Sequence, residues 1–305
     1  MADNTSSENS MTHSNADGIP TRDRLLVVGA RGYIGKRLMA AAETRFDVRG
    51  TSSSGGDGLL ALDLGQPEKF DMGAVRPGDV CLLTAAISSP DICASKHDFA
   101  WSVNVIGTSA FIQRLLDQGA RVVFFSSDTV YGQREVPFDE TSACTPAGEY
   151  AVMKHAVEKQ FLGNPGFKSI RLSYVFSRED KFTRYLAGCA QRGEEAELFH
   201  PFYRAIVHRE DVVEGALALA AGWDAVPESV VNFAGPQVLS RLEFADILRQ
   251  ESLPTLKTKR IEPADDFFEK RPRVIAMTST VLGRLLGRPA RPLREAARIE
   301  LPPQT

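Results

Sequence analysis

Short apolar runs alternate with amphipathic stretches along the first half of the chain. The runs are almost continuously apolar, as in residues 24–28, which read RLLVV, and this is typical of strands buried on both faces of a parallel sheet. Strands that alternate with helices predict an α/β fold with a doubly wound parallel sheet. The predicted strands are 24–28, 46–51, 59–62, 80–86, one that begins at 121, and 168–176; the predicted helices are 36–44, 99–116 and 150–162.

The strand–helix alternation weakens after residue 176. A helical pattern covers 181–192, a short apolar run near 228–235 predicts a strand that returns to the first sheet, and Ser240 is placed to cap a helix over 240–250. We therefore expect a first domain at 23–175, completed by the strand near 228–235, and a smaller C-terminal α/β region at 176–305. Residues 1–22 are polar and carry almost no large apolar side chains, so they are predicted to be a disordered tail.

The composition restricts the kind of partner. Hydrophobic residues make up 43% of the chain and charged residues 25%, and the net charge is −3, which is ordinary for a globular protein and argues against a surface for nucleic acid or a membrane. The four cysteines have no metal-ligand spacing and form no cluster with histidines. They are interpreted as reduced thiols of a cytoplasmic protein without a metal site.

A glycine-rich turn follows the first predicted strand. Gly29, Gly32 and Gly35 lie between that strand and a helix, which is the context of a dinucleotide-binding turn. Gly29 would allow the tight turn, Gly32 would let backbone N–H groups approach a pyrophosphate at the helix N-terminus, and Gly35 would let the helix pack closely on the sheet. The expected fold is therefore of the Rossmann type, with a nicotinamide cofactor.

The end of the second predicted strand bears on which cofactor is used. Residues 51–54 read TSSS and contain no carboxylate, whereas NAD-specific folds usually place an acid there for the ribose hydroxyls. Arg31 could pair with the 2′-phosphate of NADP. Both features favour NADP(H) over NAD(H), and the alternative is that Arg31 is simply solvated at the surface.

Candidate chemistry is provided by Tyr150 and Lys154. They are four residues apart on a predicted helix, so they lie on one face of it. A lysine ammonium near the phenol would lower the pKa of Tyr150 and make it a proton donor or acceptor near neutral pH. Ser126 and Ser127 end the strand that begins at 121, where a hydroxyl can bond an oxygen that gains charge.

These motifs together resemble the extended short-chain dehydrogenase/reductase family, which acts mostly on nucleotide sugars. The glycine spacing Gly-x-x-Gly-x-x-Gly, the pattern Ser-Ser-x-x-Val-Tyr-Gly at 126–132, and the Tyr-x-x-x-Lys at 150–154 carry the resemblance, which covers about 24–290. It implies Ser127, Tyr150 and Lys154 as the catalytic triad, with the hydride supplied by the nicotinamide.

The resemblance also implies which residues bind the cofactor and the substrate. Asn104 would order water near Lys154, and its alternative is a buried polar side chain satisfied by backbone. Arg204 would clamp a substrate phosphate, and its alternative is a surface ion pair. The expected cofactor-binding residues are Gly29, Arg31, Gly32, Tyr33, Ile34, Gly35, Thr51, Ser52, Asp63, Leu64, Thr84, Ala85, Ala86, Asn104, Tyr150, Lys154 and Tyr174, and the expected substrate-binding residues are Ser88, Asp128, Thr129 and Arg204.

Three activities remain open within this resemblance. The sequence Ser127-Asp128-Thr129-Val130-Tyr131 and the Pro90-Asp91 loop look closer to dTDP-4-dehydrorhamnose reductases, which favours an NADP(H)-dependent 4-keto sugar reductase. A nucleotide-sugar epimerase with retained cofactor is the alternative, and an NADP-binding regulatory subunit without catalysis is a further one. The resemblance also implies a homodimer through a four-helix interface made by helices near 99–116 and 150–162.

Overall fold

The structure is a computed structural model that describes residues 13–14, 20–21, 23–264, 267–268 and 271–302. Within the predicted tail it describes only two short strands, β1 (His13–Ser14) and β2 (Pro20–Thr21), which pair antiparallel. The prediction of disorder for the rest of 1–22 lies outside the described residues. No helix in the described ranges is both long and apolar enough to cross a bilayer.

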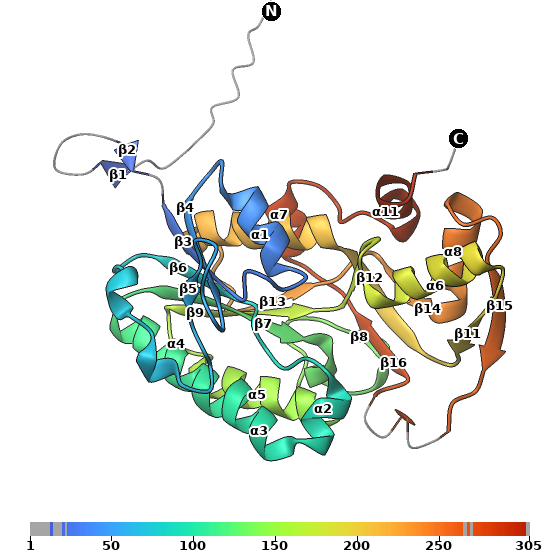
Figure 1. Ribbon diagram of the computed structural model, residues 1–305, viewed down its shortest axis with the longest axis horizontal. Helices are drawn as coiled ribbons and strands as arrows, with labels where there is room; N and C mark the ends of the chain where they lie inside the picture. The colour runs from blue at the N-terminus through green and yellow to red at the C-terminus, as the bar shows by residue number, and fades with distance from the viewer. Residues whose placement is uncertain (1–12, 15–19, 22, 265–266, 269–270, 303–305) are drawn as a thin grey trace, which may run out of the picture.

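A seven-stranded sheet forms the centre of the first domain (Figure 1). All of its neighbouring strands pair parallel, so the predicted doubly wound α/β fold is confirmed. The strand predicted from the apolar run near 228–235 lies at one edge of this sheet. In sheet order the strands are β13 (Val230–Phe233), β9 (Phe167–Leu172), β7 (Arg121–Ser127), β6 (Val80–Leu83), β3 (Arg24–Val28), β4 (Asp47–Ser52) and β5 (Leu60–Ala61).

Alternate residues of each strand pack into the two faces of this sheet. Leu25 and Val27 belong to a core shared with α1 (Gly35–Ala42), α7 (Arg209–Ala221) and α10 (Leu282–Leu286). The neighbouring residues of the same strand belong to the opposite core, which is covered by α4 (Thr108–Asp117) and α5 (Glu149–Phe161). Figure 1 shows α1 and α7 on one side of the sheet and α4 and α5 on the other. Burial on both faces explains why the strands are so uniformly apolar.

The chain leaves the first sheet at Ser173. The predicted single strand over 168–176 is wrong, because the structure divides it into β9 and β10 (Tyr174–Phe176), which belong to different sheets. The N–H of Ser173 donates to the carbonyl of Phe233 at 3.0 Å, and from there β10 pairs with β12 (Tyr203–His208) instead. The apolar run is therefore continuous in sequence although the strand is not.

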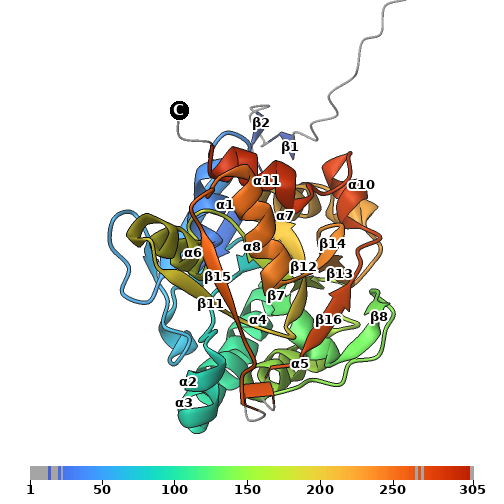
Figure 2. The same cartoon turned by 90° about the vertical axis from the view of Figure 1, so that its right-hand side faces the viewer.

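The C-terminal region is a smaller α/β unit (Figure 2). Its helices and strands enclose a core rich in phenylalanine, and Ser240 caps α8 with a capping box, as predicted. The remaining strands are β8 (Arg134–Phe138), β11 (Glu195–Phe199), β12, β14 (Gln237–Ser240), β15 (Lys257–Ile261) and β16 (Val274–Met277), and the remaining helices are α2 (Pro90–Ser95), α3 (His97–Trp101), a π-helical turn (Ser102–Gly107), α6 (Lys181–Arg192), α8 (Arg241–Glu251) and α11 (Leu293–Glu300).

Candidate active site

The glycine turn has the geometry that the motif predicts. Gly29 has φ of 89°, in the left-handed region, and the N–H of Gly32 donates to the Gly29 carbonyl at 2.9 Å. A Cβ added to Gly35 would lie 2.2 Å from that carbonyl oxygen, so α1 could not approach β3 this closely with any larger residue. The turn thus places the N-terminus of α1 beside the carboxyl ends of the strands, where doubly wound sheets bind their ligands.

A cavity of about 460 Å³ opens at this edge of the sheet. It brings the glycine turn together with Tyr150 and Lys154, which come from α5. A second hollow of about 200 Å³ adjoins it and contains Thr51, Asp63 and Leu64. The larger cavity is lined by Gly29, Arg31, Gly32, Tyr33, Ile34, Ser52, Ser53, Thr84, Ala85, Ala86, Ser88, Phe125, Ser126, Tyr150, Lys154 and Leu172.

Two of the predicted cofactor-binding residues have other positions and partners. The amide of Asn104 donates to the carbonyl of Ile87 at 2.9 Å and accepts from its N–H at 2.8 Å, so it is the buried polar residue satisfied by backbone. The hydroxyl of Tyr174 donates to Asp180 at 2.6 Å, and its ring lines a small hollow of the C-terminal region. Leu172, which precedes the switch between the two sheets, lies at the large cavity instead.

The electrostatics of Tyr150 differ from the expectation. Burial raises the pKa of the Tyr150 phenol above its ordinary value, and Cys93 and Asp128 add to this in the same direction. The expectation that Lys154 lowers this pKa is therefore wrong for this structure. The Lys154 ammonium lies 5.8 Å from the Tyr150 ring centroid and donates instead to the carbonyl of Phe125 at 2.8 Å.

The buried Lys154 has an unusual pKa of its own. Burial, the largest influence, lowers the pKa of Lys154 to about 8, although the charges of Glu158 and Cys93 raise it. An ammonium in this setting carries its charge at neutral pH and loses it within the mildly alkaline range. Lys154 is thus a cation that faces the cavity and can respond to a negative charge that develops there.

Ser127 is held by its neighbours at the end of β7. Its hydroxyl caps the short 3₁₀ turn 128–131, where it accepts from the N–H of Thr129 at 3.2 Å and from the Thr129 hydroxyl at 2.9 Å. It also donates to Asp128 at 3.2 Å. The preceding Ser126 is buried, lines the large cavity, and its hydroxyl has no hydrogen-bond partner among the described residues.

Asp128 and Arg204 are both buried at the junction between the first domain and the C-terminal region. Arg204 donates to the carbonyls of Tyr203 and Pro272 at 2.6 and 2.8 Å, so the alternative of a surface ion pair is wrong. Burial lowers the pKa of Arg204 to about 10, while the charge of Asp128 raises it. Burial in turn raises the pKa of Asp128, which Arg204 and the bond from Ser127 oppose.

The C-terminal region contains a further hollow, of about 350 Å³, which the sequence did not indicate. Aromatic rings and cationic side chains share its wall. Most of these side chains come from α6, β11, α8 and the stretch before β16. The segments are separated in sequence and meet only in the folded chain, so no single one of them predicts the hollow. The lining residues are Lys181, Phe182, Tyr185, Glu197, Phe199, Phe202, Arg241, Phe267 and Arg271.

An acid that the sequence reading missed lies beside Arg31. The guanidinium donates to the carboxylate of Asp57 at 2.7 Å and to the carbonyl of Gly55 at 3.2 Å. Asp57 stands in the loop Gly55-Gly56-Asp57-Gly58, beyond the segment 51–54 where NAD-specific folds usually carry an acid. The end of the strand therefore lacks a carboxylate, but the loop that follows it brings one to Arg31.

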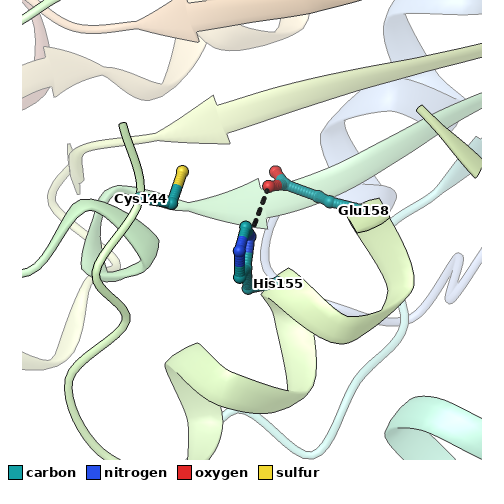
Figure 3. A group of neighbouring side chains, drawn as sticks. All are labelled: Cys144, His155 and Glu158. Carbon is teal, nitrogen blue, oxygen red and sulfur yellow. Dashed lines mark ion pairs between the residues drawn. The ribbon is translucent and has the colours of Figure 1, made fainter. Parts of the chain in front are cut away.

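Cys144 lies beside His155 and Glu158, two residues of α5 (Figure 3). Their ligand-type atoms lie within 4.8 Å of one another, although their sequence spacing showed no cluster. Glu158, however, already accepts two bonds from Arg171, at 2.8 and 3.1 Å, and one from Ser169 at 2.7 Å. A carboxylate bound in this way to a guanidinium is an ion pair of the core, so we assign no metal to it.

Comparison with known proteins shows which family the chain resembles. Residues 23–300 match the model of the RmlD substrate binding domain. A dTDP-4-dehydrorhamnose reductase of Mycobacterium tuberculosis is 27% identical over 75% of this chain and 75% of its own length. Methionine adenosyltransferase 2 subunit beta of Xenopus tropicalis is also 27% identical, over 54% of this chain and 50% of its own length.

Two solved structures have the same fold. A dTDP-4-dehydrorhamnose reductase of Bacillus anthracis in complex with NADP has a TM-score of 0.76 at 19% identity, over 92% of this chain and 99% of its own. MoeE5 in complex with UDP-glucose and NAD has a TM-score of 0.76 at 20% identity, over 91% and 97%. The chain therefore belongs to the RmlD substrate-binding domain family, and the relatives that it matches include dTDP-4-dehydrorhamnose reductases.

Proposed function

We propose that this protein reduces a keto group of a nucleotide-activated sugar, a 4-keto sugar, with NADP(H) as the hydride donor. One observation carries the proposal: Tyr150 and Lys154 line the same cavity as the glycine turn. This supports a role for the Tyr150 phenol as the proton donor beside the nicotinamide cofactor that a fold of this type would bind. The match to dTDP-4-dehydrorhamnose reductase supports this choice of reaction.

Each residue of the triad has a role that its surroundings support. The cofactor, when bound, supplies the hydride to the carbonyl carbon. The phenol of Tyr150 gives its proton to the carbonyl oxygen, and its raised pKa keeps that proton in place at neutral pH until negative charge develops on the oxygen. Lys154 places a positive charge at the cavity where negative charge develops, and Ser127 orients the substrate oxygen.

The cofactor preference rests on Arg31. It lies on the wall of the cavity, half exposed, within reach of a ligand at the end of β4. A guanidinium pairs well with a phosphate, which supports NADP(H) over NAD(H). The relatives give no single answer, since one structure of this fold is a complex with NADP and another a complex with NAD.

The aromatic hollow beside α6 and α8 supports the substrate class. Its phenylalanine rings can pack against a base, and Lys181, Arg241 and Arg271 can neutralise a diphosphate. Arg204, Asp128, Thr129 and Ser88 would face the sugar between this hollow and the cofactor cavity. Arg204 and Asp128 are buried between the two regions, which supports that placement.

The experiment that tests the proposal is a screen of 4-keto nucleotide sugars for oxidation of NADPH. A reductase consumes one NADPH for each product, so the loss of NADPH absorbance should match the product formed. An epimerase returns its hydride, so isomerisation without net absorbance change would favour that alternative. A chain that binds NADP yet turns over none of the substrates would favour the regulatory alternative.

We also propose a homodimer, formed through the helices at 97–117 and 149–161. Phe99, Ile106 and Val152 are 58, 61 and 36% exposed on these helices, and exposed apolar side chains favour burial against a second copy. Light scattering of the wild type and of Ile106→Glu tests this: a dimer that becomes a monomer supports it, and a monomeric wild type contradicts it. A cytoplasmic location stays a prediction.

A further inference from the structure

The loop that follows β4 has an unusual backbone. Gly55, Gly56, Asp57 and Gly58 all have positive φ, at 67, 83, 54 and 77°. Asp57 is the one residue other than glycine in this region of φ among those the structure describes. Aspartate tolerates a left-handed conformation better than most residues, and this conformation directs its carboxylate to Arg31.

The pair of Arg31 and Asp57 contributes little to folding. The two side chains are 50 and 88% exposed, and ion pairs as exposed as this one typically contribute little to stability. The pair therefore has a small structural value, and Asp57 can be replaced without loss of the fold. Its position is more informative, because Arg31 lines the cofactor cavity.

Arg31 is already bonded to the loop on one side. Both of its hydrogen bonds, to Asp57 and to Gly55, use the nitrogen Nη2. A 2′-phosphate that approaches this guanidinium would meet the Asp57 carboxylate within a few ångströms. Like charges about 4–5 Å apart repel even in water, and after screening by salt this repulsion should weaken binding about fivefold. A ribose hydroxyl carries no charge, and it could donate to the same carboxylate.

We propose that Asp57 is a specificity-determining residue that competes with the 2′-phosphate of NADP(H) for Arg31 and so keeps NAD(H) usable. This inference rests on the proposed role of Arg31, but not on the identity of the sugar. It predicts a cofactor preference weaker than Arg31 alone would produce. It also assigns the acid of the adenosine site to a glycine-rich loop and not to the end of the second strand.

The test measures the affinities of NADPH, NADH, 2′,5′-ADP and 5′-AMP by titration calorimetry, for the wild type and Asp57→Asn. Without the carboxylate, the two ligands with a 2′-phosphate should bind about fivefold more tightly. NADH and 5′-AMP should bind equally well or slightly less well. Since no sugar is present, the result does not depend on whether the protein reduces one.

Glu194→Gln is the matched control. Glu194 pairs with Arg192 at 2.7 Å, the same distance as in the Arg31–Asp57 pair, and the side chains of Glu194 and Arg192 are also exposed, at 56 and 57%. It removes one exposed charge from the end of α6, so it should leave all four affinities unchanged. Arg31→Ala should remove most of the preference for the 2′-phosphate; if it does not, the proposed role of Arg31 fails.

Two results would overturn the inference about Asp57 itself. One is an unchanged ratio of NADPH to NADH affinity in Asp57→Asn, which would mean that the pair is only a surface contact. The other is weaker binding of 2′,5′-ADP, which would mean that Asp57 orients Arg31 toward the phosphate. A failed screen of sugars, by contrast, would leave both ligand titrations as they stand.

Discussion

Arg271 donates to both carboxylate oxygens of Asp91, at 2.8 Å each, across 180 positions of sequence. Asp91 lies in the first turn of α2, which follows the edge of the cofactor cavity, and Arg271 lines the aromatic hollow of the C-terminal region. The pair joins the two parts of the molecule between which the substrate is proposed to lie. Asp91 belongs to the Pro90-Asp91 loop, whose sequence looks closer to dTDP-4-dehydrorhamnose reductases.

Asp91→Asn should therefore weaken the binding of the substrate more than the binding of the cofactor. We expect the KM for the nucleotide sugar to rise about fivefold, the loss of an exposed charge-assisted pair, while the Kd for NADPH stays constant. Steady-state kinetics at saturating NADPH measures the first quantity and calorimetry the second. Glu194→Gln is again the control. An equal loss of both affinities would show that the pair holds the fold and not the substrate site.

Tyr150→Phe removes the exchangeable proton and keeps the ring. General acid catalysis contributes about 10²–10⁴-fold, so turnover should fall by that factor while the protein stays folded. NADPH affinity should change little, since the glycine turn, Arg31 and Lys154 remain. Single-turnover oxidation of NADPH is the measurement. A folded variant that binds NADPH and keeps full activity in its pathway would remove the enzymatic role of Tyr150 and favour the regulatory alternative.

Local patterns predicted the parts of the site that are local in sequence. The glycine turn, the small residues Thr84–Ala86 and the Tyr150–Lys154 pair lie at the cavity because each depends on one strand–helix unit. Tyr174 was misplaced, because a strand that changes sheets at Ser173 looks the same as one that does not. The position of a sheet switch depends on which partner strands are available, and these come from β12 and β13, far along the chain.

Long-range contacts account for the other missing features. Asp57 reaches Arg31 only through a loop of glycines, and no residue pattern fixes where such a loop folds. The predicted direction of the pKa shift of Tyr150 was wrong, because burial depends on the packing of several elements, whereas the spacing to Lys154 depends on one helix. A charge four residues away matters less than the loss of water around both groups.

Glu158 should make the protein sensitive to acid. Burial, the largest influence, raises its pKa, but the neighbouring His155, the bonds and charge of Arg171 and the bond from Ser169 together lower it to about 2, from the ordinary 4.5. Between these values the unfolded chain binds the proton and the folded chain does not. The free energy of unfolding therefore rises with pH through this window. The stability that Glu158 contributes is lost as pH falls from 4.5 toward 2.

Glu158→Gln tests this, but it leaves Arg171 buried without its charged partner and should cost about 3–5 kcal/mol. The double variant Glu158→Gln with Arg171→Met avoids the unpaired charge and should fold. Urea unfolding across acidic pH should show a steep loss of stability in the wild type and a shallower one in the double variant. Equal slopes in the two proteins would mean that other carboxylates control acid unfolding.

Lys154 should make cofactor binding sensitive to mild alkali. Its pKa is lowered to about 8, below the ordinary 10.5, because it is buried. The ammonium therefore loses its proton as pH rises through about 8, while the same lysine in the unfolded chain keeps it until 10.5. Over that range the unfolded chain holds more protons, so the free energy of unfolding gains from this group as pH rises. The affinity for an anionic cofactor decreases as pH rises, because the cavity loses a positive charge.

The Kd for NADPH should thus be constant near neutral pH and increase above pH 8. Lys154→Met keeps an unbranched side chain of similar length in the same buried position. It should bind NADPH more weakly at neutral pH and lose the increase above 8, since no ammonium remains to titrate. Fluorescence titrations of both proteins across this range make the comparison, with Lys159→Met, a lysine in the last turn of the same helix, as the control. A wild-type Kd that stays constant well above pH 8, or a Lys154→Met protein that keeps the wild-type dependence, would show that Lys154 does not bind the cofactor through its charge.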